Sequence, residues 1–412
     1  MQTELAAFIR NTPEGREADA ILRSCVHCGF CAATCPTYQL LGDELDGPRG
    51  RIYLIKQVLE GKPVTDKTRL HLDRCLTCRS CETTCPSGVK YSRLLDIGRR
   101  VVDERLPRRL GDRLTRLALK EALPRRWIFG PAVKIGHMLR PLLPSALADK
   151  LPPEAAGEER PWPTTTGHGR RMLALAGCVQ PSLAPNINAA TARVLDRLGI
   201  TLFEADGAGC CGALRFHLND QEAARNDMRR NIDAWWPHVA AGVEAIVVTA
   251  SGCGVQVKDY GHALQDDPAY AAKAARVSEL CRDPSEVLAA EHGRLQPVLA
   301  ELRSERGRLA FHAPCTLQHG LKIRGVIEGL LSEVGYVLTP VADSHLCCGS
   351  AGTYSVLQPE LSGRLRDNKL AALNAGSPTA IATANIGCLT HLQAGSVLPV
   401  RHWIELIDEV LQ

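Results

Sequence analysis

Eight cysteines near the start of the chain form two motifs of identical spacing. The first motif, CVHCGFCAATCP, carries Cys25, Cys28, Cys31 and Cys35, and the second, CLTCRSCETTCP, carries Cys75, Cys78, Cys81 and Cys85. Both follow the pattern Cys-x2-Cys-x2-Cys-x3-Cys-Pro, which binds iron–sulfur clusters in bacterial two-cluster proteins. Structural zinc usually takes two Cys-x2-4-Cys pairs, and disulfide frameworks belong to short secreted chains, so both alternatives fit poorly. The spacing therefore predicts two [4Fe–4S] clusters.

In two-cluster ferredoxins, the fourth cysteine of each motif ligates the cluster of the other motif. We therefore assign Cys25, Cys28, Cys31 and Cys85 to the first cluster, and Cys75, Cys78, Cys81 and Cys35 to the second. Pro36 and Pro86 follow the fourth cysteines, and we expect each to end a local helix. Five nearby arginines are candidates to stabilise reduced clusters, although surface solvation is the expected role for most: Arg49, Arg51, Arg74, Arg79 and Arg93.

Length and composition bound the class of protein. The 412 residues are enough for two or three domains, and the 45% hydrophobic and 23% charged contents are ordinary for a soluble globular protein. Seventeen cysteines suit a reducing compartment, where thiolates bind metals. The net charge of +4 is too small to argue for nucleic acid as a partner. No apolar run approaches the roughly 20 residues of a membrane-spanning helix, and the polar first residues predict no signal peptide.

One segment is markedly basic. Residues 99–140 contain twelve Lys or Arg and four Asp or Glu, an excess of eight positive charges, interspersed with Leu, Ile, Trp127 and Phe129. A basic amphipathic segment of this kind can lie on an anionic membrane surface. A solvated helix face and a docking surface for another subunit are the alternatives.

Residues 1–150 have mainly helical patterns. The 39 residues between Cys35 and Cys75 include GRIYLIKQVLEG, in which Ile52, Ile55, Val58 and Leu59 recur at helical spacing before a capping Gly61. This predicts a helical two-cluster ferredoxin-type domain instead of the compact β-rich ferredoxin. Residues 151–170 are rich in Pro, Gly, Thr and charge, and are predicted to be a linker.

The remainder of the chain is an internal repeat built around eight further cysteines. In each half, 31 residues separate a first cysteine from an adjacent pair, and 41 or 39 residues separate that pair from a last cysteine. The two sets are Cys178, Cys210, Cys211 and Cys253, and Cys315, Cys347, Cys348 and Cys388. Glycine follows both pairs. We call residues 171–305 the first repeat and residues 306–412 the second repeat.

Each repeat has the pattern of an α/β unit. The apolar runs RMLALAG and AIVVTA are typical of buried strands, and NAATARVLDRLG has helical periodicity with Ala192, Leu195 and Leu198 on one face. The predicted fold class is therefore α+β overall: a helical two-cluster domain, followed by two α/β Cys-Cys-Gly units.

The role of the repeated cysteines stays open between three hypotheses. They ligate a further iron–sulfur centre, form a redox-active thiol or quinone-facing site, or are structural. Adjacent cysteines suit metal ligation or redox chemistry better than packing. Four histidines are candidate substitute ligands: His217, His312, His345 and His391. Cys281 lies outside the pattern and is expected to be structural.

The whole chain resembles a known family. Twin ferredoxin motifs followed by two Cys-Cys-Gly repeats occur in iron–sulfur subunits associated with heterodisulfide reductases, anaerobic glycerol-3-phosphate dehydrogenase and lactate utilisation. The stretches LLGDELDGPRGRIYLIKQVLEG, DSHLCCGSAGTY and RHWIEL are most similar to the iron–sulfur subunits of bacterial glycolate oxidases. The widest form of the repeat ends in Cys-x2-Cys, whereas Cys253 and Cys388 are followed by Gln256 and His391 at that position. This departure puts a heterodisulfide-reductase type of cluster in doubt.

The resemblance implies a function and partners. Flavin-containing subunits D and E oxidise glycolate to glyoxylate with FAD, and this subunit passes the electrons towards quinone or another membrane acceptor. The implied location is cytoplasmic, at the inner face of the cytoplasmic membrane. This chain then contributes electron transfer to an oxidoreductase and has no catalytic residue of its own. The alternatives are the iron–sulfur subunit of a lactate or glycerol-3-phosphate dehydrogenase, and a self-contained disulfide or quinone reductase that uses the Cys-Cys-Gly half.

Overall fold

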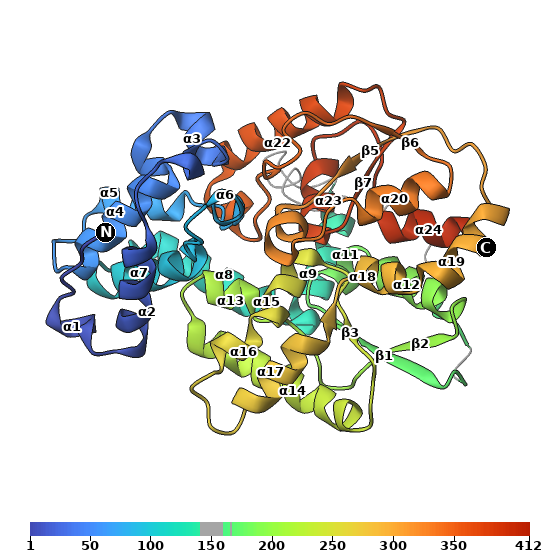
Figure 1. Cartoon of the computed structure of the whole chain (residues 1–412), viewed down its shortest axis with the longest axis horizontal. Coiled ribbons are helices and arrows are strands. Elements are labelled where there is room, and N and C mark those ends of the chain that lie inside the picture. Colours follow the sequence, from blue (N-terminus) through green and yellow to red (C-terminus); the bar gives the residue numbers. More distant parts are fainter. Residues whose placement is uncertain (141–159, 165–166) are drawn as a thin grey trace. The chain divides into compact units, whose positions relative to one another are not determined.

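The structure, a computed structural model, describes residues 1–140, 160–164 and 167–412 (Figure 1). The chain forms two compact units. The first unit comprises residues 1–117 and 345–369, and the second comprises residues 118–344 and 370–412. The first is helical and the second contains two parallel sheets, which confirms the predicted α+β class. Most of the predicted linker, residues 151–170, lies outside the described residues, and the predicted domain boundaries stay a prediction.

The first unit is built from short helices that frame the two cysteine motifs. From residues 1–117 they are α1 (Ala7–Arg10), α2 (Pro13–Ser24), η1 (Phe30–Ala32), α3 (Pro36–Leu41), η2 (Glu44–Asp46), α4 (Pro48–Leu59), α5 (Asp66–Asp73), α6 (Ser80–Thr84) and α7 (Tyr91–Arg105). Residues 345–369 add α21 (Tyr354–Leu357). Two boundaries between the units fall inside helices, one in α8 (Leu110–Ala122) and one in α22 (Pro359–Asn374).

Helices α4 and α7 form the centre of the first unit. The apolar face predicted for α4 is buried as expected: Ile52, Ile55, Val58 and Leu59 are each at most 3% exposed. Gly98 of α7 allows close packing, because a Cβ at this position would lie 2.7 Å from the Ile55 side chain. Gly61 adopts a φ of +88° beyond the end of α4, which confirms the predicted cap.

The second unit contains one sheet from each repeat. The first sheet has the order β2-β1-β3-β4 and the second has the order β6-β5-β7-β8, and all pairings are parallel. The strands are β1 (Arg170–Ala174), β2 (Ile200–Glu204), β3 (Ile246–Val247), β4 (Cys281–Arg282), β5 (Arg308–His312), β6 (Val337–Thr339), β7 (Ala380–Thr383) and β8 (Val400–His402). The same strand order in both sheets confirms the predicted α/β repeat.

Helices connect the strands of the second unit. Before and within the first repeat they are α9 (Arg126–Leu139), α11 (Gln180–Leu183), α12 (Asn186–Asp196), α13 (Ala213–His217), α14 (Gln221–Ala240), α15 (Ser251–Lys258), α16 (Tyr260–Ala263), α17 (Ala271–Leu280), α18 (Pro284–Ala290) and α19 (His292–Glu301). The second repeat contributes η4 (Thr316–Leu321), α20 (Val326–Glu333), α23 (Ile386–Gln393) and α24 (Trp403–Val410). Ala192, Leu195 and Leu198 are buried, as their spacing predicted.

One local prediction was incomplete. Pro86 follows the end of α6, as expected, but Pro36 is also the first residue of a new helix, α3. Proline suits the first helical position, because its missing N–H would have no intrahelical acceptor there. Among the described residues, no helix has the length and apolar character needed to cross a membrane.

Candidate iron–sulfur sites

Five cysteines from both motifs line a pocket in the first unit, which we call the first cavity. Three come from the first motif and two from the second: Cys25, Cys28, Cys31, Cys81 and Cys85. Cys28 is exposed, and Cys25 is buried. The structure thus brings together the four residues that the crossed pattern assigned to one cluster, and their four-thiol donor set fits a [4Fe–4S] cluster.

A second cavity in the same unit has the complementary set of cysteines. It is lined by Cys35, Cys75, Cys78 and Cys81. Three of these cysteines are buried, and only Cys78 is partly exposed. Cys81 also borders the first cavity, so the two cavities are neighbours. The donor set of the second cavity fits a second cluster in the same way.

The backbone of the two motifs is bent at equivalent positions. His27 and Thr77, each just before the second cysteine of its motif, have φ values of +57° and +52°, and Gly29 and Arg79, just after it, have +85° and +60°. Non-glycine residues rarely adopt this left-handed conformation, which persists only where the surrounding structure enforces it. The paired bends turn each loop so that its three thiols face one cavity.

Burial favours the protonated form of three thiols that line these cavities. Burial raises the pKa of Cys31 to about 11 and holds the pKa of Cys81 well above its usual range. Burial likewise raises the pKa of Cys25. Because cluster ligands are thiolates, binding a cluster must release these protons.

Polar groups surround the second cavity. Thr37 Oγ1 lies 3.3 Å from Cys35 Sγ, and the Tyr91 hydroxyl donates to Cys75 Sγ at 3.6 Å. Arg51, which is 1% exposed, places Nη1 4.0 Å from Cys35 Sγ. Arg51 is therefore one of the five candidate arginines that lies buried beside a cavity, and the surface role expected for most of them does not apply to it. Hydrogen bonds to cluster sulfurs are one of the means by which proteins set reduction potential.

A buried carboxylate organises this polar shell. Asp46, with 0% exposure, accepts from Arg74 Nη1 at 2.9 Å and faces His71 Nδ1 at 3.0 Å and Arg51 Nη2 at 3.5 Å. Sequence reasoning missed Asp46, His71, Thr37 and Tyr91 as parts of the site. The turn sequence around Asp46 carries no indication of these long-range partners.

In the first repeat, the four predicted cysteines form a chain of neighbouring thiols. Cys178 follows β1, Cys210 and Cys211 precede α13, and Cys253 lies on α15. The thiol of Cys210 is hydrogen bonded to those of Cys178 and Cys211, and Cys211 is also bonded to Cys253. The bonds from Cys178 and Cys211 lower the pKa of Cys210, while the bond to Cys210 and burial raise the pKa of Cys178. Neighbouring thiols that include an adjacent pair suit metal ligation or redox chemistry better than packing.

Side chains on α14 and α16 fix the backbone of the cysteine pair in the first repeat. Asn231 Nδ2 donates to the Cys210 carbonyl oxygen at 2.8 Å, and the Tyr260 hydroxyl donates to the Cys211 carbonyl oxygen at 2.9 Å. Gly212 has a φ of +88°, and a Cβ there would lie 2.9 Å from the Ala224 carbonyl oxygen. Its equivalent in the second repeat, Gly349, has a φ of +89°. The glycine after each cysteine pair therefore adopts a left-handed backbone conformation that other residues rarely adopt.

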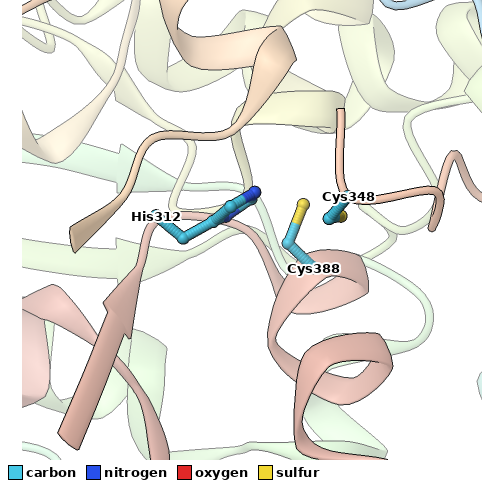
Figure 2. A group of neighbouring side chains, drawn as sticks. All are labelled: His312, Cys348 and Cys388. Carbon is cyan, nitrogen blue, oxygen red and sulfur yellow. The ribbon is translucent and has the colours of Figure 1, made fainter. Parts of the chain in front are cut away.

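The second repeat differs in its donor set. Figure 2 shows His312 at the end of β5, Cys388 on α23 and Cys348 of the cysteine pair. Within the second unit, one ring nitrogen of His312 lies within 4.8 Å of the Cys388 sulfur, and both residues are buried. His312 Nδ1 lies 2.9 Å from Thr383 Oγ1 of β7. His312 occupies the position of Leu175 in the first repeat, so the repeats are chemically unlike.

Cys281 has none of these associations. It is 0% exposed in β4, and burial raises the pKa of its thiol to about 12. Its sulfur contacts the Gly254 carbonyl oxygen at 3.7 Å. These features agree with the structural role predicted for it.

Family comparisons match both halves of the chain. A model described as a 4Fe-4S dicluster domain matches residues 21–89, and one described as a cysteine-rich domain matches residues 172–258 and 309–393. The glycolate oxidase iron-sulfur subunit of Escherichia coli K12 is 56% identical, and the match covers 100% of both chains. A probable glycolate oxidase iron-sulfur subunit of Bacillus subtilis 168 is 32% identical over 94% of this chain and 92% of that protein.

A more distant relative covers only part of the chain. Lactate utilization protein A of Bacillus licheniformis is 26% identical over 56% of this chain and 96% of that protein. The two full-length matches and the two kinds of cysteine domain therefore decide the family. This chain belongs to the family of glycolate oxidase iron–sulfur subunits, and its role is electron transfer.

Proposed function

We propose that this chain carries electrons from a flavin subunit that oxidises glycolate to glyoxylate, through two [4Fe–4S] clusters, towards quinone. The observation that carries the proposal is the pair of adjoining cavities, each lined by at least four cysteines drawn from both motifs. A flavin releases two electrons and a cluster accepts one at a time, so two neighbouring clusters suit a relay. The ligands are Cys25, Cys28, Cys31 and Cys85 for one cluster, and Cys35, Cys75, Cys78 and Cys81 for the other.

The substrate chemistry belongs to partner subunits that correspond to subunits D and E and contain FAD. The support is the family itself, because both full-length relatives are named as iron-sulfur subunits of glycolate oxidase. This chain then supplies binding, orientation and electrostatic tuning of its clusters, while the redox chemistry of the clusters is their own.

We assign the membrane contact to α9, on the cytoplasmic side. Its exposed face carries Trp127, Ile135 and Met138, which are 74%, 52% and 72% exposed, at intervals of eight and three residues. Lys134 lies on the same face, and α9 contains no Asp or Glu. Exposed apolar and basic side chains on one helix face match the interface of an anionic lipid surface.

A further metal centre in the Cys-Cys-Gly half is part of the proposal. The neighbouring thiols of the first repeat support it, because four cysteines from three chain segments meet there and adjacent cysteines suit metal ligation better than packing. The second repeat offers nitrogen as well as sulfur. A structural role for this half predicts no metal there.

Metal analysis of the anaerobically purified chain tests these assignments. About eight irons with matching acid-labile sulfide and EPR of two coupled clusters would support the relay and leave the Cys-Cys-Gly half free of clusters. About twelve irons, with a signal lost on Cys211→Ala or Cys348→Ala, would place a cluster in that half. Zinc without sulfide would contradict the proposal.

Activity of the reconstituted complex separates the rival functions. With the flavin partners present, turnover of glycolate but not of lactate or glycerol 3-phosphate would support the assignment of substrate. Disulfide or quinone reduction by the isolated, chemically reduced chain, lost on Cys211→Ala, would favour a self-contained reductase instead. The four contacting thiols of the first repeat are the observation that keeps this second candidate in view.

A further inference from the structure

The second cavity contains a buried cation that the first lacks. Arg51 is 1% exposed, and its Nη1 and Nη2 each lie 3.1 Å from Thr37 Oγ1. Its Nε donates to the His71 carbonyl oxygen at 2.7 Å. The guanidinium is therefore held in one orientation, with Nη1 4.0 Å from Cys35 Sγ.

The positive charge near the second cavity exceeds its local counter-charge. Asp46 is shared between Arg51 Nη2 at 3.5 Å and Arg74 Nη1 at 2.9 Å, so one carboxylate faces two guanidinium groups. Arg99, 8% exposed, adds a third guanidinium, whose Nη2 donates to the Cys75 carbonyl oxygen at 2.8 Å. Buried charges are screened less by water and salt than exposed charges, so the buried guanidinium groups act on the cavity more strongly than surface charges would.

The corresponding arginine of the first cavity is in a different environment. Arg49, two residues earlier on α4, is 39% exposed and pairs with Glu44 at 2.6 Å. Water and the Glu44 carboxylate both offset the positive charge of Arg49. The first cavity is also open to water at Cys28, which is exposed. The two arginines therefore form a natural comparison within one helix.

We propose that Arg51 makes the second cavity's cluster the more easily reduced of the two, so that electrons pass from the first cluster to the second. The proposal rests on the cluster assignment of the proposed function. Each transfer moves one electron, lost at the first cavity and gained at the second, with no bond or proton change. Burial by itself disfavours added negative charge, and the fixed guanidinium opposes this effect.

Hydrogen bonds act in the same direction. The Tyr91 hydroxyl donates to Cys75 Sγ at 3.6 Å, and Thr37 Oγ1 lies 3.3 Å from Cys35 Sγ. Donors to cluster sulfurs stabilise the additional negative charge of the reduced state. Tyr91 is buried, so water does not compete for its hydroxyl. It offers a milder substitution than the removal of Arg51.

The experiment is an EPR-monitored redox titration of the full chain, with iron and sulfide measured first. Cys28→Ala and Cys78→Ala variants assign the signals to the first and second cavity. We expect Arg51→Gln to lower the reduced-to-oxidised ratio of the second cluster at least tenfold at a fixed potential, equal to 59 mV for one electron. Tyr91→Phe should lower this ratio by a smaller factor. Arg49→Gln should change the ratio of the second cluster less than twofold.

The outcomes separate this proposal from the cluster assignment. Absence of iron and sulfide would overturn both. Two clusters that titrate together or in the reverse order, or an Arg49→Gln shift as large as that of Arg51→Gln, would overturn this proposal alone. If Arg51→Gln does not fold, Tyr91→Phe provides the test. An unchanged reduction potential of the second cluster in Tyr91→Phe would contradict the proposal that polar groups beside the second cavity favour its reduction.

Discussion

The Tyr354 hydroxyl donates a 3.2 Å hydrogen bond to the carbonyl oxygen of Arg74, the residue directly before Cys75. Tyr354 belongs to residues 345–369, the segment of the second repeat that joins the first compact unit. The cysteine pair Cys347 and Cys348 lies on this same segment. A ligand loop of the second cavity is thus tied to the segment that carries the Cys-Cys-Gly motif.

We predict that Tyr354→Phe loosens the second cluster. Loss of one partly buried hydrogen bond costs about 1 kcal/mol, which corresponds to roughly a fivefold change in an equilibrium. Iron release from the anaerobic protein to a ferrous chelator should therefore be severalfold faster. Tyr53→Phe is the matched control, since Tyr53 is 47% exposed on α4, and it should leave the rate unchanged. Equal rates in wild type and Tyr354→Phe would contradict the prediction.

The crossed ligand sets predict which variants resemble one another. Cys85→Ala should lose the same cluster as Cys28→Ala, although Cys85 is in the other motif, because both cysteines line the first cavity. EPR of the two reduced variants should show the same remaining cluster, and each should retain about four irons. If Cys85→Ala instead matched Cys78→Ala, each motif would hold its own cluster. Cys281→Ala should keep both clusters.

Regular elements and the cysteine sets were predictable because their patterns are local or repeated. The period of α4 follows from residues within one helix, and the two Cys-Cys-Gly sheets follow from a repeated cysteine spacing. The environment of Arg51 was not predictable. Its partners Thr37, Asp46 and His71 lie 14, 5 and 20 residues away, on three other elements, and the sequence shows only an arginine beside a motif.

The two repeats also look more alike in sequence than in structure. His312 was one of four histidines named as candidate ligands, but the matched cysteines did not single it out as the one that lies beside Cys388, where the first repeat has Leu175. The repeat spacing likewise carried no information on the packing of residues 345–369 with residues 1–117, because such packing depends on side chains far apart in the chain.

The glycine after the first cysteine pair should be intolerant of substitution. Residue 212 has a backbone φ of +88°, which strains an alanine, and the Cβ added in Gly212→Ala would lie 2.9 Å from the Ala224 carbonyl oxygen. Conformational strain and a steric clash therefore add together. Gly242, with a φ of +90° and no atom within 4 Å of such a Cβ, isolates the strain. Gly242→Ala should cost about 1 kcal/mol and Gly212→Ala at least about 1–3 kcal/mol more. Thermal unfolding of the two variants measures the difference, and equal losses would contradict the clash.

The α9 surface predicts lipid binding that depends on charge. Trp127→Ala and Lys134→Glu should each weaken co-sedimentation with vesicles containing anionic lipid, because one removes an interfacial aromatic and the other reverses a charge. Val397→Ala is the control, as Val397 is 96% exposed in a loop of the second repeat. Binding to neutral vesicles should be weak throughout. If the variants instead lost a partner subunit while vesicle binding was unchanged, the surface would be a subunit interface.

Two equivalent helix caps predict opposite pH dependences. Asp283 caps α18 and His402 caps α24, and both form capping boxes directly after the last strand of their sheets. Burial lowers the pKa of His402 to about 4 and raises that of Asp283 to about 7. His402 is neutral in the fold, so its contribution is complete above the unfolded pKa near 6.5 and is lost as pH falls towards 4. Protonated Asp283 contributes below its unfolded pKa near 3.9, and this contribution is lost as pH rises towards 7.

The His402→Asn variant separates the two effects. Asparagine retains a capping acceptor but does not titrate, so the variant should lack the acid-side loss that His402 imposes. A depression of about 2.5 pKa units corresponds to about 3 kcal/mol, which is an upper bound for a group that relaxes on protonation. Between pH 6.5 and 4, the stability difference between wild type and variant should therefore shift in favour of the variant as pH falls. Chemical unfolding at several pH values measures it, and a constant difference would show that His402 does not titrate on unfolding.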